Sequence, residues 1–185
     1  MGTRGKRRDA ENSIDISSDE PILQSAKQVI DLARERGLFN GSSLDVEKVA
    51  NSMGIEVVKE KLKDNISGKL EINGDDARIV INAEHSRQRQ RFTIAHELGH
   101  YILHRKEQNT FEDVIFFRGK DMTNIEYSAN KFAGDLLMPE DKVRERISSG
   151  IKDLRELSSY FDVSVAAMRY RVVNLGYIVK SDGNG

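Results

Sequence analysis

The spacing of apolar residues predicts two helices near the amino terminus. Apolar side chains recur at the helical period between Pro21 and Gly37, which predicts a helix that begins at Pro21 and ends at Gly37. Residues 42–45 resemble a capping box, with Ser42 as the predicted cap. This pattern predicts a second, shorter helix that stops at Gly54.

Alternating apolar and polar residues then predict a small group of strands. Residues 55–58 have the composition of a strand, and two further runs, 70–72 and 77–81, flank the turn-forming residues 73–76. This arrangement is typical of a β-hairpin. We also hypothesise that residues 78–82 form a sheet edge, to which a substrate chain could add as an extra strand.

The carboxy-terminal half is predicted to be mostly helical. A long helix begins within 86–92 and runs to about His104, and residues 105–122 look like a loop. Another helix is predicted over 124–137, followed by two or three short helices over 140–178. Because helices and a few antiparallel strands occupy separate blocks of the chain, the expected fold class is α+β.

Composition divides the chain into a central region and polar tails. Residues 1–20 and 181–185 are predicted to be tails, 21–140 a compact domain and 141–180 a helical module. The 29 Lys and Arg residues nearly balance 30 Asp and Glu residues, which argues against a broadly basic nucleic-acid-binding surface. No apolar run approaches the ~18 residues of a membrane span, and no apolar core follows the basic amino terminus. We therefore expect a cytoplasmic protein.

One short motif carries candidate chemistry. The chain has no cysteine, so a metal ion would have to be held by His, Asp or Glu. Residues 96–100 match His-Glu-x-x-His, and on a helix His96 and His100 lie on one face, where both imidazoles can bind one ion. Glu97 is rotated by ~100° and can reach a water molecule on that ion. This pattern is typical of a zinc site in which the glutamate acts as general base for peptide hydrolysis. The alternative is a helix with solvent-facing histidines.

The third metal ligand stays open on spacing alone. His104 lies ~12 Å along a continuous helix from His96, so it is a candidate for supporting a ligand or contacting substrate. The downstream carboxylate candidates are Glu107, Glu112, Asp113, Asp121, Glu126 and Asp135. Glu126 stands out because its helix face is otherwise small and apolar, and Asn130, one turn later, could orient a ligand. Alternatively, Glu126 completes a capping box that begins at Thr123.

The motif and its downstream helix together resemble a known family. Residues 91–104, followed by the pattern of residues 126–139, resemble the ImmA/IrrE metallopeptidases of bacteria and phages. The resemblance implies a zincin-like fold with Glu97 as general base. It implies one Zn²⁺ per chain, held by His96, His100 and Glu126. It also implies a partner: a cognate helix-turn-helix repressor or antitoxin of the Xre type, whose cleavage relieves repression.

Other features of the sequence leave alternatives. Residues 154–175 resemble a helix-turn-helix, with Ser164 as a cap and Gly176 as a stop. Arg169 and Arg171 could face DNA phosphates, but the surrounding charges nearly cancel, so direct DNA binding is not expected. A non-catalytic repressor- or DNA-binding module with a structural metal is the alternative function. The candidates for stabilising an oxyanion are Tyr101, Tyr127 and His104.

Overall fold

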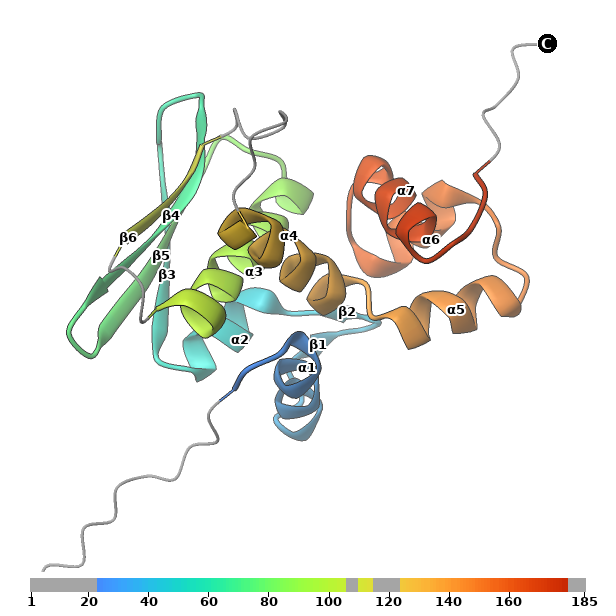
Figure 1. The fold of residues 1–185 in the computed structure, drawn as a ribbon, viewed down its shortest axis with the longest axis horizontal. Coiled ribbons are helices and arrows are strands. Elements are labelled where there is room, and N and C mark those ends of the chain that lie inside the picture. The colour runs from blue at the N-terminus through green and yellow to red at the C-terminus, as the bar shows by residue number, and fades with distance from the viewer. Residues whose placement is uncertain (1–22, 106–109, 115–123, 180–185) are drawn as a thin grey trace, which may run out of the picture.

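A computed structural model describes residues 23–105, 110–114 and 124–179. In Figure 1, a sheet lies on one side, α3 and α4 cross the middle, and α5–α7 lie on the other side. The predicted tails, 1–20 and 181–185, lie outside the described residues. The α+β class is confirmed, since the described chain combines helices with two small sheets.

The first two helices begin later than the sequence pattern predicts. Helix α1 (Ala26–Glu35) starts after Ser25, whose side chain accepts a hydrogen bond from the Gln28 N–H, so the predicted start at Pro21 is wrong. Helix α2 (Val46–Ser52) is capped by Asp45, not by the predicted Ser42. Two short strands, β1 (Phe39–Asn40) and β2 (Ser43–Leu44), pair between these helices. The Ser42 hydroxyl instead donates to the Tyr160 carbonyl at 2.9 Å.

The main sheet has the strand order β3-β5-β4-β6. Its strands are β3 (Ile55–Glu60), β4 (Ile66–Asn73), β5 (Asp76–Asn82) and β6 (Thr110–Val114). The predicted hairpin is confirmed as the antiparallel pair β4–β5. The expectation that the strands are antiparallel is wrong for β3, which pairs with β5 in parallel. The loop predicted over residues 105–122 is wrong at β6, which pairs with β4. Both pairings join segments distant in sequence, which local alternation does not predict.

Strand β5 lies inside the sheet, so the hypothesis that residues 78–82 form an edge is wrong. Ile79, Val80 and Ile81 are all fully buried, which means that both faces of β5 are covered. A strand that is apolar on both faces favours an interior position with partners on both sides. Among the described strands, β3 and β6 form the two edges.

Helix α3 (Arg87–His104) occupies the centre of the core. It packs against β4 on one side and against α4 (Asn124–Leu137) on the other. At the crossing, a Cβ added to Gly99 would meet Ala129 Cα and the Ala129 carbonyl oxygen, each at 3.2 Å. The glycine therefore permits a close approach of α3 to α4.

We expect Gly99→Val to push α4 away from α3. Overpacking costs about 1–3 kcal/mol, so the free energy of unfolding should fall by that amount. The matched control is Gly134→Val on α4, where an added Cβ meets nothing within 4 Å. Urea unfolding of both variants measures the difference. Equal stability of the two variants would contradict a tight crossing at Gly99.

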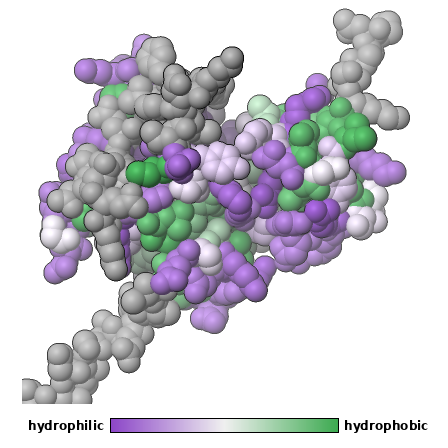
Figure 2. All heavy atoms as spheres, in the orientation of Figure 1, coloured by the Kyte–Doolittle hydropathy of each residue, from purple (hydrophilic) through white to green (hydrophobic). Residues whose placement is uncertain are grey.

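The carboxy-terminal part forms three short helices, as predicted. These are α5 (Glu140–Ser148), α6 (Leu154–Phe161) and α7 (Val165–Asn174). Ser164 caps α7 as expected. Arg171, however, donates to the Met138 carbonyl at 2.9 Å and pairs with Asp135 at 2.7 Å, so it does not face DNA phosphates. Val165 and Val173 are exposed on α7, and Figure 2 shows hydrophobic side chains at the surface of the carboxy-terminal part, on the right of the view.

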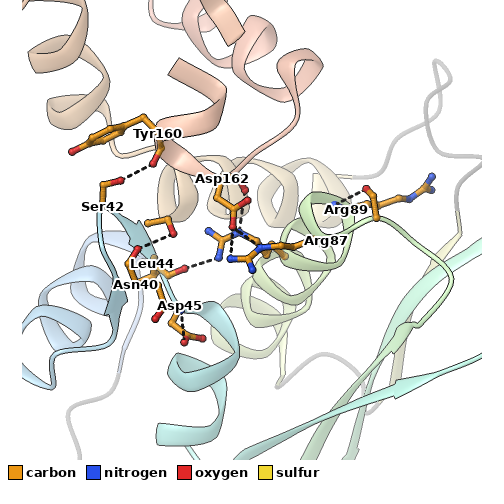
Figure 3. A network of polar contacts seen from close by, with 11 residues as sticks. Asn40, Ser42, Leu44, Asp45, Arg87, Arg89, Tyr160 and Asp162 are labelled. Atoms are coloured by element: carbon orange, nitrogen blue, oxygen red, sulfur yellow. Dashed lines mark hydrogen bonds and ion pairs between the residues drawn. The ribbon is translucent and has the colours of Figure 1, made fainter. Parts of the chain in front are cut away.

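A buried arginine ties α3 to the end of α6. Arg91 donates to the Leu44 carbonyl at 2.8 Å and to the Asp162 carbonyl at 3.0 Å. The side chain of Asp162, whose backbone is left-handed with φ 52°, pairs with Arg91 at 3.2 Å and with Arg87 at 2.8 Å. Figure 3 shows Arg87 and Asp162 pointing toward each other. The helix that carries the histidines is thus anchored to the carboxy-terminal helices.

We expect Arg91→Ala to destabilise the fold far more than Arg87→Ala. The Arg91 side chain is 9% exposed. Its removal deprives two backbone carbonyls of a hydrogen-bond donor and the Asp162 carboxylate of an ion-pair partner. The expected loss is about 2–4 kcal/mol. Arg87 is 67% exposed, so its pair is worth about 0–1 kcal/mol. Urea unfolding compares the two, and a larger loss for Arg87→Ala would refute this ranking.

Candidate metal centre

Two helices bring three of the predicted ligands together. His96 and His100 come from α3, and Glu126 comes from the first turn of α4. The two histidine Nε2 atoms lie 3.0 Å apart, and Glu126 oxygens lie 3.3 Å from His96 Nε2 and 3.4 Å from His100 Nε2. His96 is 2% exposed and His100 is 1% exposed. These values overturn the alternative of solvent-facing histidines.

The separations of these three atoms suit a tetrahedral ion. Zinc binds nitrogen and oxygen ligands at about 2.0–2.2 Å, so neighbouring ligand atoms around it lie about 3.3–3.5 Å apart. Two of the three distances fall in this range, and the distance between the two histidine nitrogens, 3.0 Å, is slightly shorter. Imidazole and carboxylate ligands are also those that zinc accepts. This group could therefore hold a metal ion.

Helix α4 also supports one of the histidines. The Asn130 Oδ1 atom lies 3.1 Å from His96 Nδ1. An N–H at Nδ1 that donates to this oxygen leaves the lone pair of Nε2 directed at the cluster. Asn130 thus lies beside a candidate ligand, one helical turn after Glu126.

Glu97 lies on α3 next to His96 and is fully buried. Burial removes the side chain from bulk water. In the sequence of α3, Glu97 lies between the two histidines. Its carboxylate would be available for proton transfer only to a group that enters this site. This position is compatible with the predicted role of general base.

The surrounding chain matches a known family of metallopeptidases. Residues 50–173 match the IrrE N-terminal-like domain, Peptidase_M78. The protein belongs to this family. The match includes the helices that carry His96, His100 and Glu126, together with most of the carboxy-terminal helices.

The match between this chain and its relatives covers a different share of each relative's length. Metallopeptidase ImmA of Bacillus subtilis is 29% identical over 135 residues, which is 71% of this chain and 77% of ImmA. The radiation response metalloprotease IrrE of Deinococcus radiodurans is 33% identical over 96 residues, 50% of this chain but only 29% of IrrE. A Mycobacterium tuberculosis transcriptional regulator shares the fold with TM-score 0.57 and 18% identity, covering 80% of this chain and 46% of that one.

Among the remaining ligand candidates, Asp135 is the one whose side chain the structure describes, and it lies outside the group. Asp135 pairs with Lys131 and Arg171. Glu107 and Asp121 lie outside the described residues, and Glu112 and Asp113 lie in β6, whose side chains the structure does not describe. Thr123, the start of the alternative capping box, is also outside the described residues. Within the described chain, Glu126 contacts both histidines, as a third ligand would.

The three candidates for oxyanion stabilisation have different surroundings. Tyr101 accepts a hydrogen bond from Arg105 at 3.1 Å, and Tyr127 is 54% exposed. His104 Nδ1 lies 3.3 Å from His100 Nδ1, and His104 Nε2 lies 2.9 Å from the Ser128 hydroxyl. The sequence does not predict Ser128, because no helical spacing relates it to the motif on α3.

Within the described residues, no helix is both long and apolar enough to cross a membrane.

The two histidines alter the acidity of Glu126. In the metal-free protein, burial raises the pKa of its carboxyl, but hydrogen bonds from His100 and His96, with their attraction for the negative charge, lower the pKa from 4.5 to about 2. The fold therefore favours the ionised form of Glu126, which is the form that binds a metal cation.

We expect Glu126 to make the stability of the metal-free protein depend on pH. A lowered pKa in the fold means that the contribution is present above the unfolded value of 4.5 and is lost as the pH falls toward about 2. The stability difference between wild type and Glu126→Gln should therefore shrink as the pH falls. Urea unfolding with chelator present, between about pH 5 and 3, measures it. If the stability difference between the two proteins does not change with pH, the pKa of Glu126 is not lowered by the fold.

Proposed function

We propose that this protein is a zinc-dependent endopeptidase. The observation that carries the proposal is the group of His96, His100 and Glu126, whose nitrogen and oxygen atoms are spaced like the ligands of a tetrahedral ion. The buried Glu97 on the same helix turn supplies a carboxylate for proton transfer. Membership of a metallopeptidase family supports this proposal.

Each residue would have a defined part in hydrolysis. His96, His100 and Glu126 would hold one Zn²⁺, which supplies Lewis acidity that polarises a peptide carbonyl and acidifies water. Glu97 takes a proton from water as its oxygen attacks the carbonyl carbon. It then passes the proton to the nitrogen as the carbon–nitrogen bond breaks. Asn130 orients His96 throughout by accepting a hydrogen bond from Nδ1–H.

The proposed substrate is a helix-turn-helix repressor or antitoxin of the Xre type. The resemblance of residues 91–104 and 126–139 to the ImmA/IrrE peptidases supports this class of substrate. Cleavage would relieve transcriptional repression in the cytoplasm, without direct contact between this protein and DNA. The engagement of Arg171 with Asp135 and Met138 agrees with a helical module that is not shaped for phosphates.

A cleavage assay with metal removal tests the proposed activity. The zinc-loaded protein is incubated with the repressor encoded by a neighbouring gene, and the products are identified by mass spectrometry. We expect cleavage at one peptide bond, its loss on chelation and its return when zinc is added. A repressor that stays intact under all conditions, while the protein still binds it, would favour the alternative of a non-catalytic module with a structural metal.

A further inference from the structure

His100 stands at the head of a chain of contacts that leads from α3 to α4. His100 Nδ1 lies 3.3 Å from His104 Nδ1, and His104 Nε2 lies 2.9 Å from the Ser128 hydroxyl. That hydroxyl donates in turn to the Ile125 carbonyl at 2.8 Å. His100 is 1% exposed and His104 is 8% exposed, so bulk water has little access to either ring. The chain therefore joins the candidate ligand to the backbone of the helix that carries Glu126.

The direction of each hydrogen bond decides which nitrogen of His100 carries the proton. The Ser128 hydroxyl donates to the Ile125 carbonyl, so the serine oxygen can accept from an N–H at His104 Nε2. A neutral His104 with its proton on Nε2 has a lone pair on Nδ1. That lone pair accepts from an N–H at His100 Nδ1. The Nε2 lone pair of His100 is then left for the metal.

The opposite arrangement would prevent metal binding at the same atom. If His104 carried its proton on Nδ1, it would donate to His100 Nδ1 and leave the His100 proton on Nε2. A protonated Nε2 cannot bind a metal ion. The hydrogen bond from the Ser128 hydroxyl to the Ile125 carbonyl favours the arrangement with the His104 proton on Nε2, because the serine oxygen then accepts that proton.

We propose that His104 and Ser128 are positioning residues that set the tautomer and orientation of His100 for metal binding. This inference rests on the part of the proposed function that assigns His100 to the metal, and not on peptidase activity. Together with Asn130 at His96, it makes α4 the source of support for both histidines of the motif. Loss of such supporting contacts typically costs about 10–100-fold in metal affinity.

Zinc affinity of serine variants tests the proposal without any substrate. We expect Ser128→Ala to weaken zinc binding about tenfold, measured by competition with a chromophoric chelator at fixed pH. Ser128→Thr keeps a hydroxyl at this position and should restore most of the affinity. Unfolding of both variants in urea, without metal, checks that the fold is retained. Unchanged zinc affinity in Ser128→Ala would overturn the proposal.

A double-mutant cycle separates a tautomer effect from a packing effect. In His104→Asn, the amide oxygen can take the place of Nδ1 and accept from His100 without help from Ser128. We therefore expect Ser128→Ala to lower zinc affinity by less than about twofold in this background, against about tenfold in the wild type. Equal effects in both backgrounds would assign Ser128 to packing alone and overturn the proposal.

Ring ¹⁵N chemical shifts report the proton positions directly. In the zinc-loaded wild type, His104 should show a protonated Nε2 and an unprotonated Nδ1, and His100 a protonated Nδ1. Ser128→Ala should move the His104 shifts toward a mixture of tautomers. A wild-type His104 with its proton on Nδ1 would overturn the proposal, while leaving the peptidase assay unaffected.

Discussion

Glu97→Gln should abolish most peptidase activity while zinc binding is retained. The change removes the carboxylate that accepts a proton but keeps the size and shape of a side chain that is fully buried. Loss of a general base typically costs about 10²–10⁴-fold in rate. The measurement is single-turnover cleavage of the repressor, with zinc affinity determined in parallel. Affinity should stay within about twofold, because Glu97 is not among the proposed metal ligands.

The control for this prediction is Glu140→Gln, the same chemical change on the surface. Glu140 lies on α5, pairs with Arg144 and has a side chain 55% exposed, so cleavage should be unaffected. Full cleavage by Glu97→Gln would remove Glu97 from the mechanism. If Glu97→Gln loses cleavage but retains its effect on transcription in cells, the protein regulates its partner by binding and not by hydrolysis.

His100→Ala should lower zinc affinity more than any change around the cluster. It removes one of three proposed ligands, and His100 also contacts Glu126 and His104. We expect a loss beyond about 100-fold, larger than the effect of a supporting residue. Peptidase activity at limiting zinc should fall in parallel. Chelator competition measures the affinity of the variant against the wild type.

The chain offers a matched histidine for this experiment. His85 lies on the connection between β5 and α3, outside the group that could hold a metal ion. His85→Ala should bind zinc like the wild type and cleave at the wild-type rate. Equal zinc affinity of His100→Ala and His85→Ala would show that His100 is not a ligand, and the proposed site would have to be abandoned.

The local sequence pattern predicts an element correctly where the residues of that segment themselves favour its structure. The pattern around the motif predicts a helix that begins within 86–92 and ends near His104, and α3 spans Arg87–His104. The hairpin around residues 73–76 is also predicted, since turn residues between alternating strands specify a local pairing. The loop expected over 105–122 is wrong at β6, because this strand is stabilised by its distant partner β4 and carries little signal alone.

The sequence by itself determined the chemistry that this protein can offer. Two histidines four residues apart on a helix share a face, and the absence of cysteine restricts the ligands to His, Asp and Glu. These conclusions need only the helical period and the properties of side chains. The choice of Glu126 among the downstream carboxylates comes from the resemblance to ImmA/IrrE peptidases, since spacing alone leaves it open.

Only the tertiary structure decided what surrounds the histidines. The crossing of α3 and α4 at Gly99 sets Glu126 against both histidines, and it places Asn130 beside His96 and Ser128 beside His104. The tertiary structure also places β5 inside the sheet and pairs Arg171 with Asp135 of α4. These outcomes depend on the packing of segments far apart in sequence, and the periodicity of one segment carries no information about which surface of another will cover it.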